Sequence, residues 1–429
     1  MKRTYIRDIE PEKEVKIAGW VERYRDSKNM IFIVMKDITG HIQVTIEKAT
    51  NEELVKKLNG VIANSVLTIT GIAHLSEYVK MGGIEMIPTD IKVESIADAL
   101  PITDEANIDQ KLDHRWIDLR SDKNILLFKA QSAFAEGFRE YLIKNNFTEI
   151  HTPKIIGTAS ESGSDVFELT YFDTKAYLAQ SPQFYKQMAM ASGFERIFET
   201  GPVFRAEKSY TNRHATEFTG FDLEFSYIDS YEDVMDLEED VLIHALTRVK
   251  EKYGDAIKET FGVDVVIPTK PFPRMKLADL YQIFEKEYGY TIPDSEKNDL
   301  TTDAERLCYK YSMEKFGHEF MFVTDYPTEK RAFYHMRKDG IAQGYDLIWK
   351  GVEITTGAQR EHRYEILKAQ AEEKGLAKDV QFYLQFFKYG CPPHGGFGIG
   401  LDRITMLLLN IPSIKEAEFL FRGPNRITP

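Results

Sequence analysis

The sequence predicts an α+β protein with two domains, a small N-terminal β-barrel and a larger domain of mixed helices and strands. The chain has 429 residues, which is too long for a single compact core. In its first hundred residues, apolar and polar residues alternate as they do in short β-strands, and the rest of the sequence mixes helical and extended patterns. Hydrophobic residues at 43% and charged residues at 29% are ordinary for a globular enzyme and argue against a disordered chain.

Residues 1–100 are expected to form the barrel. Four strand-like segments, VKIAGWVERYR, MIFIVMKDITGHIQVTI, SVLTITGIAHL and GIEMIPTDIKVES, are interrupted by one helical stretch, NEELVKKLNG. The second segment contains a turn at Thr39-Gly40 and therefore counts as two strands. Five or so strands with one helix suit an oligonucleotide-binding (OB) barrel. An unrelated small β-barrel is the alternative that the pattern leaves open.

Residues 101–120 are expected to act as a linker, because PITDEANIDQKLD carries a proline and little hydrophobic periodicity. Residues 121–429 then form the larger domain. Apolar spacing predicts a helix over about 125–144, followed by an extended segment in which Pro153 fixes a bend or a sheet edge. The acidic stretch at about 230–320 is expected to be a solvated helical insertion.

The net charge of −13 weighs against a nucleic-acid partner, since affinity for RNA comes largely from Lys and Arg that meet phosphates. Residues 1–100, however, contain 14 Lys+Arg against 15 Asp+Glu. The acidity therefore belongs to the larger domain, and the small domain can still present one basic face.

Cysteine usage and hydropathy exclude several classes. Cys308 and Cys391 lie far apart without a CxxC pattern, which excludes a zinc knuckle and a disulfide framework. The first residues form no secretory signal, and no run of about 18 uninterrupted apolar residues occurs, so we expect a cytoplasmic protein without a membrane partner.

Residues 201–225, GPVFRAEKSYTNRHATEFTGFDLEF, predict a strand, a polar loop and a returning strand. Because side chains in a strand repeat every two residues, Arg205 and Glu207 are expected to share a face, and so are Phe218, Asp222 and Glu224. With Arg213 and His214 in the loop, this hairpin is equipped to hold a nucleoside triphosphate through cations and a ring. A surface hairpin with incidental charges is the alternative.

Residues 345–360, YDLIWKGVEITTGAQR, predict a second hairpin, and Arg360 closes it. With a turn at 350–351, the expected cross-strand pairs are Trp349 with Val352, Ile348 with Glu353, and Asp346 with Thr355. Asp346 and Glu353 then share one sheet face, which suits Mg²⁺ accompanied by substrate phosphates. A solvent-facing pair of acids is the alternative.

Residues 389–403, YGCPPHGGFGIGLDR, combine glycines with a following apolar run. A dinucleotide fingerprint would need a βαβ unit and a later acidic residue, but the chain is nearly over. The pattern favours a Gly-rich strand whose backbone lies close to a ligand, leading into a buried helix that carries Arg403 near its start.

These segments together resemble a known family. FRAE with RHATEFT resembles motif 2 of the class II aminoacyl-tRNA synthetases, GFGIGLDR resembles motif 3, and FTEIHTPKI resembles motif 1. QSPQFYKQ (180–187) and SESGSDVFELTYF (160–172) narrow the resemblance to the aspartyl enzymes of the archaeal and eukaryotic type. The resemblance covers nearly the whole chain. It implies an antiparallel-sheet catalytic domain, ATP and Mg²⁺ as cofactors, and tRNA and L-aspartate as partners.

The resemblance also implies residue roles. Arg205 would bridge the substrate carboxylate and the α-phosphate, while Phe218 and Arg403 would sandwich adenine. Glu207 would bond the base or its neighbourhood, and Arg213 with His214 would reach the outer phosphates. Asp346 and Glu353 would bind Mg²⁺. The residues implied at the amino acid are Glu161, Ser181, Gln183, Lys186, Asp222 and Arg360.

The barrel resembles the anticodon-binding domain of the same family. There Phe32 would stack on the central anticodon base and Gln43 would hydrogen-bond its edge, with Arg25 in the matching RYRD segment. A core position is the alternative for Phe32. We also expect a homodimer, because the apolar helix from Ile125 and the strand around Pro153 predict a surface that a monomer would expose.

Aspartate is the expected amino acid, because burial of its anionic side chain requires fixed cations, and Lys186 and Arg360 stand where the family has its pocket. Asparaginyl relatives look more like SGQL followed by an acid at the Lys186 segment. An asparaginyl-tRNA synthetase is the closest alternative. A paralogue that no longer charges tRNA, either a small-molecule asparagine-forming enzyme or an RNA-binding regulator, is the alternative of another class.

Overall fold

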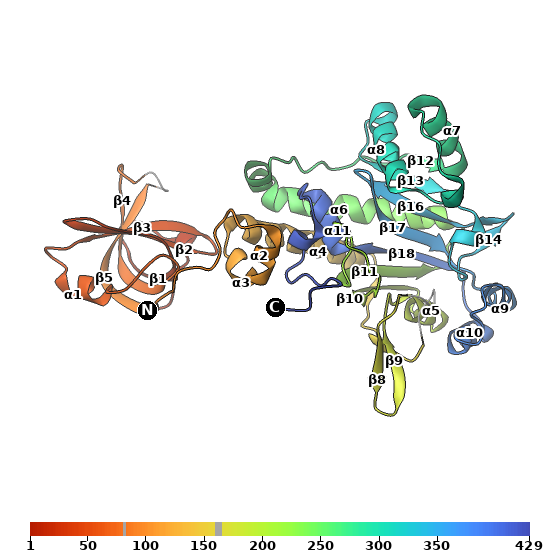
Figure 1. Cartoon of the computed structure of the whole chain (residues 1–429), viewed down its shortest axis with the longest axis horizontal. Helices are drawn as coiled ribbons and strands as arrows, with labels where there is room; N and C mark the ends of the chain where they lie inside the picture. Colours follow the sequence, from red (N-terminus) through yellow and green to blue (C-terminus); the bar gives the residue numbers. More distant parts are fainter. Residues whose placement is uncertain (80–82, 159–164) are drawn as a thin grey trace. The chain divides into compact units, whose positions relative to one another are not determined.

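The computed structural model describes residues 1–79, 83–158 and 165–429. Contacts divide the chain into two compact units, Met1–Glu105 and Ala106–Pro429, drawn in Figure 1. Each unit encloses a hydrophobic core of its own. Within the described ranges, none of the helices combines the length and the apolar composition that crossing a membrane requires.

The first unit is a closed barrel with the strand order β1-β2-β3-β5-β4. Its elements are β1 (Glu14–Asp26), β2 (Met30–Asp37), β3 (Gly40–Glu47), α1 (Glu52–Lys57), β4 (Val66–Leu75) and β5 (Ile84–Ser95). Buried and half-buried residues alternate along β2, so that Ile31, Ile33 and Met35 fill the interior. This closed barrel confirms the predicted OB barrel. It could be predicted because the alternation of apolar and polar residues and the turn at 39–40 are both visible in the sequence.

The second unit is built on an eight-stranded sheet with the order β12-β13-β16-β17-β18-β11-β10-β6 among the described residues. The strands are β6 (Thr148–Glu149), β10 (Arg196–Phe204), β11 (Glu217–Ser226), β12 (Arg274–Lys276), β13 (Phe320–Thr324), β16 (Gly344–Trp349), β17 (Val352–Gln359) and β18 (His394–Gly400). The central neighbours are antiparallel, and only the edge pairs β12–β13 and β10–β6 are parallel among these strands. This confirms the predicted α+β class.

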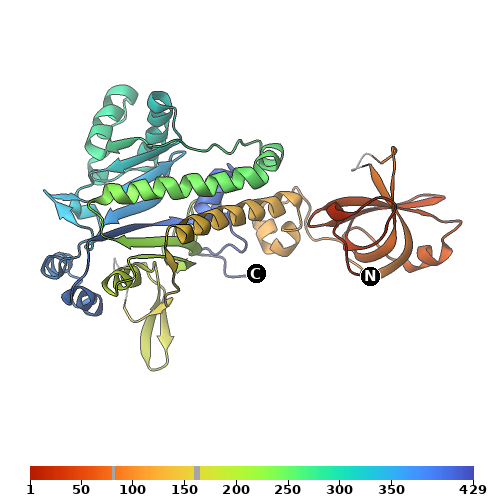
Figure 2. The same cartoon turned by 180° about the vertical axis from the view of Figure 1, so that it is seen from behind.

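Two long helices, α4 (Asp122–Lys144) and α6 (Tyr231–Phe261), pack against each other over one face of this sheet, as Figure 2 shows. Helix α6 differs from the expected solvated insertion at 230–320. Val234, Leu242 and Val249 lie on one side of it and are buried in the main core. The acidic residues of this helix occupy mainly its other side, and their number concealed the buried stripe.

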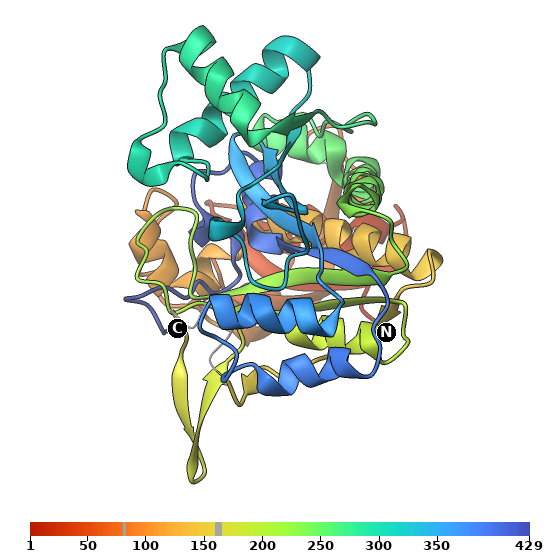
Figure 3. The same ribbon diagram turned by 90° about the vertical axis from the view of Figure 1, so that its right-hand side faces the viewer.

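The rest of the expected insertion is also part of the domain. Helices α7 (Leu277–Tyr288) and α8 (Thr302–Phe316) share a hydrophobic cluster with β13 and β16, in which Leu280, Cys308 and Val323 are buried. Figure 3 shows α7 and α8 at the opposite end of the sheet from α9 (Tyr364–Glu373) and α10 (Gln381–Lys388).

The expected linker at 101–120 differs from the structure as well. Helices α2 (Ile108–Asp113) and α3 (Arg115–Asp118) form within it and belong to the second unit. Asn107 and Gln110 make a reciprocal capping box at the start of α2. The buried Arg115 guanidinium donates to the carbonyls of Glu416 (2.9 Å) and Glu418 (2.8 Å), which ties α3 to the C-terminal segment.

The remaining elements complete the two units, η1 in the first and the others in the second. They are α5 (Gln183–Ala191), α11 (Leu401–Leu408), α12 (Ile414–Ala417), β7 (Ile155–Ile156), β8 (Glu168–Tyr171), β9 (Thr174–Leu178), β14 (Arg337–Lys338), β15 (Ile341–Ala342) and the 3₁₀ turns η1 (Ile6–Asp8), η2 (Asp294–Glu296) and η3 (Thr328–Lys330).

Candidate active site

The hairpin predicted from residues 201–225 forms from β10 and β11, but β10 ends before Arg205. Arg205 and Glu207 therefore lie in the connecting loop, and the prediction that both are on the strand is wrong. The Arg205 N–H still donates across the hairpin to the Thr216 carbonyl (2.9 Å), while the Ala206 N–H points to the other side and donates to the Asp165 carbonyl (2.8 Å). Both side chains still reach the cavity over the sheet.

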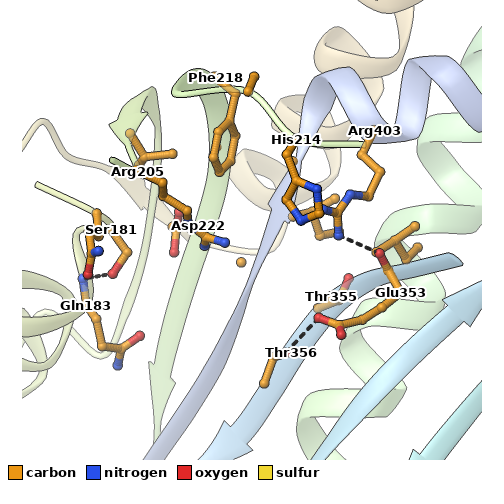
Figure 4. Close-up of a pocket in the computed structure, with 18 of the residues that line it drawn as sticks. Ser181, Gln183, Arg205, His214, Phe218, Asp222, Glu353, Thr355, Thr356 and Arg403 are labelled. Carbon is orange, nitrogen blue, oxygen red and sulfur yellow. Dashed lines mark hydrogen bonds between the residues drawn. The ribbon is translucent and has the colours of Figure 1, made fainter. Parts of the chain in front are cut away.

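An aromatic ring and two guanidinium groups converge at one end of this cavity (Figure 4). The guanidinium carbon of Arg205 lies 5.3 Å from the centre of the Phe218 ring. Arg403, on α11, donates from Nη1 to the carbonyl of Glu353 (2.8 Å) and from Nη2 to the carbonyl of Arg213 (3.3 Å). Arg403 thus joins the hairpin loop to the start of β17. A ring between two fixed cations suits a nucleotide base and its phosphates.

The hairpin loop adds a histidine and a third arginine. The Nδ1 of His214 lies 3.1 Å from Ser209 Oγ and also contacts Thr211, and burial lowers the pKa of His214. Arg213 Nη1 donates to Glu305 Oε2 at 3.0 Å. Glu305 belongs to α8, the region expected to be a solvated insertion, and no pattern in the sequence pointed to its place beside the loop.

Four buried charges lie together at the opposite end of the cavity, and three of them, Lys186, Asp222 and Arg360, line it. The Nζ of Lys186, whose side chain is 1% exposed, lies 2.9 Å from Asp222 Oδ1 and 3.5 Å from Glu224 Oε2. Arg360 Nε donates to Glu224 Oε1 at 3.0 Å. Burial alone would favour the neutral acid, but the charges of Arg360 and Lys186 outweigh it and lower the pKa of Glu224. The sequence pattern placed Glu224 only on the same strand face as Asp222, and Glu224 was not among the predicted site residues.

Polar side chains at the start of α5 border these charges. The Gln183 N–H donates to Ser181 Oγ at 3.1 Å, and Gln183 Oε1 accepts from Arg360 Nη2 at 3.3 Å. His335 Nε2 lies 3.3 Å from Arg360 Nη1, and Tyr334 also lines the cavity. No pattern in the sequence pointed to these last two residues, because neither stands in a motif.

The two acids predicted on the second hairpin lie on one face but differ in their surroundings. Arg331 holds both oxygens of the Asp346 carboxylate, with Nη1 at 2.8 Å from Oδ1. Thr356 Oγ1 lies within hydrogen-bond distance of Asp346 (2.9 Å) and of Glu353 (3.2 Å). Burial and then the charge of Asp346 raise the pKa of Glu353 to about 7. Glu353 lines the cavity, whereas Asp346 is buried behind the lining and its charge is balanced by Arg331.

One predicted pairing in this hairpin is wrong. Ile348 pairs with Glu353 as expected, but a bulge between Leu347 and Ile348 sets Asp346 opposite Thr356 and not Thr355. The bulge leaves an extra residue in β17 and so allows Glu353 and Thr356, three positions apart, to face the same carboxylate. A two-residue alternation cannot reveal such an insertion from the sequence.

The structure brings almost all of the predicted catalytic-domain residues to one cavity of about 250 Å³. Those that line it are Ser181, Gln183, Lys186, Arg205, Glu207, Arg213, His214, Phe218, Asp222, Glu353, Arg360 and Arg403. Asp346 lies behind the lining, and Glu161 falls outside the described residues. Buried cations at one end and a ring with guanidinium groups at the other suit an anionic small molecule joined to a nucleotide.

The barrel residues form a separate group. Phe32 and Gln43 lie half-buried on the outer side of β2 and β3, where their neighbours Ile33 and Val44 point into the barrel. Gln43 Nε2 donates to Thr45 Oγ1 at 3.2 Å. Arg25, on β1, is exposed and pairs in register with Phe32. The outward position of Phe32 argues against the alternative that it is a core residue.

Two family models match the chain. Residues 107–422 match the model of "tRNA synthetases class II (D, K and N)", and residues 15–94 match that of an "OB-fold nucleic acid binding domain". The chain is 39% identical to an "Aspartate--tRNA(Asp/Asn) ligase" of Aeropyrum pernix, with all of both chains covered. It is 40% identical to an "Aspartate--tRNA(Asp) ligase" of Pyrococcus abyssi, with 97% of this chain and 96% of that one covered.

Solved structures show the same fold. An asparaginyl-tRNA synthetase from Pyrococcus horikoshii, complexed with asparaginyl-adenylate, superposes with a TM-score of 0.90 at 30% identity over all of both chains. An aspartyl-tRNA synthetase from Entamoeba histolytica superposes with a TM-score of 0.88 at 31% identity, covering all of this chain and 93% of that one.

Proposed function

The chain belongs to the class II tRNA synthetases of the D, K and N group, and we propose that within this group it activates L-aspartate with ATP and loads the aspartate onto transfer RNA. The observation that carries this assignment is the buried pair Lys186 and Arg360 at one end of the cavity. Full-length relatives named aspartate--tRNA ligases support it.

Hydrogen-bond chemistry favours aspartate over asparagine at these cations. Ammonium and guanidinium groups only donate, so both can bond a side-chain carboxylate, whereas the NH₂ group of asparagine would find no acceptor on either. Asp222 and Glu224 balance the two positive charges of Lys186 and Arg360. Asp222 is then the acceptor for the substrate ammonium, while Ser181 and Gln183 border the backbone end of the substrate.

The other end of the cavity suits ATP. Attack of the aspartate carboxylate on the α-phosphorus spreads negative charge over the phosphate oxygens, and positioned cations stabilise that charge. Arg205 is proposed for the α-phosphate, Arg213 and His214 for the outer phosphates, and Phe218 with Arg403 for the base, near Glu207. Attack by a tRNA hydroxyl on the adenylate then depends mainly on positioning, so neither step needs a covalent nucleophile from the protein.

The two hairpin acids fit Mg²⁺ in part. Glu353 fits, since it lines the cavity with a carboxylate whose raised pKa reflects burial beside another acid. Asp346 fits less well, because Arg331 already occupies both of its oxygens. We therefore propose Glu353 as the direct ligand, with Asp346 behind it and held by Arg331; the single Thr356 hydroxyl proton serves one of the two carboxylates at a time. When bound with ATP, the ion would neutralise phosphate charge.

The barrel is proposed to bind the anticodon, with Phe32 stacking on a base, Gln43 reading its edge and Arg25 nearby. A cytoplasmic homodimer completes the proposal. The apolar face expected on α4 is covered by α6 of the same chain, which corrects the surface predicted for the dimer. The homodimer is supported instead by three exposed apolar side chains, those of Trp116, Ile155 and Phe419, which are 55%, 49% and 60% exposed.

Charging assays test this function directly. Full-length protein with ATP, Mg²⁺ and tRNA is expected to form aspartyl-tRNA, and parallel reactions with tRNA(Asp) and tRNA(Asn) measure the range of tRNAs. Formation of asparaginyl-tRNA instead would favour the alternative of an asparaginyl-tRNA synthetase, the enzyme that the similar Pyrococcus horikoshii structure is named as. Absence of any charged tRNA would leave the non-charging paralogue.

A further inference from the structure

A chain of buried amides leads from the amino-acid pocket to a histidine outside it. Gln183 and Gln187 stand one turn apart on α5, and Gln183 Nε2 donates to Gln187 Oε1 at 3.0 Å. Gln187 Nε2 lies 3.0 Å from Nε2 of His394, the first residue of β18. Both His394 and Gln187 are fully buried.

The carbonyl of Pro392 is the starting point for assigning donors and acceptors in this series of side chains. His394 Nδ1 lies 2.8 Å from the oxygen of Pro392, which only accepts, so Nδ1 carries a proton. Burial lowers the pKa of His394 to about 4, so the ring is neutral near pH 7 and Nε2 is an acceptor. Gln187 must therefore turn its NH₂ group to His394 and its oxygen to Gln183.

The orientation of Gln187 fixes that of Gln183 in turn. Gln187 Oε1 also accepts from the Tyr383 hydroxyl at 2.9 Å, so two donors hold this oxygen in place. With its NH₂ group engaged by Gln187, Gln183 presents Oε1 to Arg360 Nη2 at 3.3 Å. A reversed Gln187 would reverse Gln183 and set an NH₂ donor against the guanidinium, which is also a donor.

We propose that His394 is a positioning residue which, acting through Gln187, orients the Gln183 amide and so holds Arg360 for the side chain of the amino-acid substrate. This inference rests on the proposed function, because it assigns the relay to the amino-acid end of the same cavity. The backbone adds an anchor that a change of the His394 side chain leaves in place, since the Arg360 N–H donates to the His394 carbonyl at 2.8 Å. The side chain of His394 can therefore be tested by itself.

Three variants of the full-length protein separate the relay from general packing. His394→Leu removes the acceptor for Gln187, and His394→Gln keeps an acceptor near the position of Nε2. Gln187→Met removes the amide that links His394 to Gln183. Ser226→Ala is the matched control, because Ser226 is also buried and lies opposite His394 in the β11–β18 register, but its hydroxyl contacts Met190. Each is assayed by ATP–pyrophosphate exchange, with KM measured for aspartate and for ATP.

His394→Leu is expected to raise the aspartate KM about tenfold or more while the ATP KM stays within about twofold, since one buried amide loses its partner. His394→Gln should recover most of the loss, and Ser226→Ala should match wild type. The aspartate KM of the double variant His394→Leu/Gln187→Met should be no higher than that of Gln187→Met, because both changes interrupt the same series of hydrogen bonds.

Equal changes in the two KM values, additive effects in the double variant, or a glutamine variant no better than the leucine variant would overturn the inference. If His394→Leu does not fold, Gln187→Met and His394→Gln decide by the same KM comparison. Failure of the proposed function looks different, because wild type would then show no exchange with aspartate. The relay is in that case tested with whichever amino acid wild type activates.

Discussion

Lys186 is the residue on which the choice of amino acid depends most. Its Nζ lies 2.9 Å from Asp222 with only 1% of the side chain exposed, so Lys186→Leu changes the charge of the pocket and not the surface of the protein. We expect aspartate-dependent pyrophosphate exchange to fall at least about a hundredfold, about 2.7 kcal/mol, as when one partner of a buried charge pair is removed. ATP binding should survive, because the nucleotide contacts lie at the other end.

Lys175 supplies the control for that change. It also pairs with a carboxylate, Glu168 at 2.8 Å, but it is 71% exposed on β9. Lys175→Leu should leave exchange at the wild-type level. Unchanged aspartate activation in Lys186→Leu would show that the specificity assignment is wrong.

Phe32 tests the barrel at the same scale. If its ring stacks on an anticodon base, Phe32→Ala should weaken tRNA charging by about 1–3 kcal/mol. Exchange without tRNA should not change, because the catalytic cavity lies in the other unit. Parallel charging and exchange assays check this, and a loss of both activities would mean that Phe32 supports folding.

At the residue scale, the residues that the motifs singled out lie together in the structure, and their roles stay predictions. Arg205, Phe218 and Arg403 stand in spaced motifs, and all three line the cavity. Residues that act through buried pairs were missed. Glu224 and His394 become informative only when folding sets them beside Arg360 and Gln187, and no spacing along the chain encodes those contacts.

The glycines of β18 give a prediction at the scale of one element. A Cβ at Gly396 would clash with the backbone oxygen of Leu223 and approach Glu224 Oε2 at 2.5 Å, whereas a Cβ at Gly400 would make ordinary contacts with the Phe218 ring at 3.7 Å and Arg403 Cβ at 3.9 Å. Gly396→Ala should therefore destabilise the protein by about 1–3 kcal/mol. Gly400→Ala should stay within about 0.5 kcal/mol of wild type. Thermal unfolding of the two variants measures the contrast, and equal Tm values would contradict it.

A second prediction at this scale concerns helix α6 and the dependence of protein stability on pH. Burial raises the pKa of Glu238 from 4.5 to about 8, and its Oε2 accepts from the Tyr345 hydroxyl at 2.6 Å. A folded-state pKa above the unfolded value gives stability that is complete below about pH 4.5 and is lost as the pH rises towards 8. Glu238→Gln removes this titration and keeps an acceptor for Tyr345.

The Tm of Glu238→Gln should therefore rise relative to wild type as the pH increases from 5 to 8, by the equivalent of up to about 1.4 kcal/mol per pH unit. Thermal unfolding of both proteins in matched buffers measures the difference. A difference that does not vary with pH would mean that Glu238 is ionised in the folded protein.

At the element scale, predictions from the sequence were accurate where one face of an element is apolar and the other polar. The barrel strands alternate cleanly, as in β2, and were predicted. Helix α6 was misjudged because acidic residues are frequent along it, and two of them, Glu238 and Glu239, are themselves buried among the apolar residues. The bulge in the β16–β17 hairpin could not be predicted, since it depends on the pairing of two strands and not on either one alone.

For the whole molecule, the dimer is the prediction that the exposed apolar residues support. Trp116 and Phe419 lie on segments that Arg115 ties together, and both are more than half exposed. Sedimentation at micromolar concentration should give about twice the 49.5 kDa of one chain. A species of 49.5 kDa under those conditions would refute the dimer.

Activation of aspartate is the central claim, and it requires neither tRNA nor a dimer interface to be measured. The most direct test is ATP–pyrophosphate exchange by the wild-type protein with aspartate and with asparagine, side by side, at equal concentrations. The buried cations Lys186 and Arg360 predict exchange with aspartate and none above background with asparagine. Exchange with asparagine at a comparable rate, or with neither amino acid, would contradict the account.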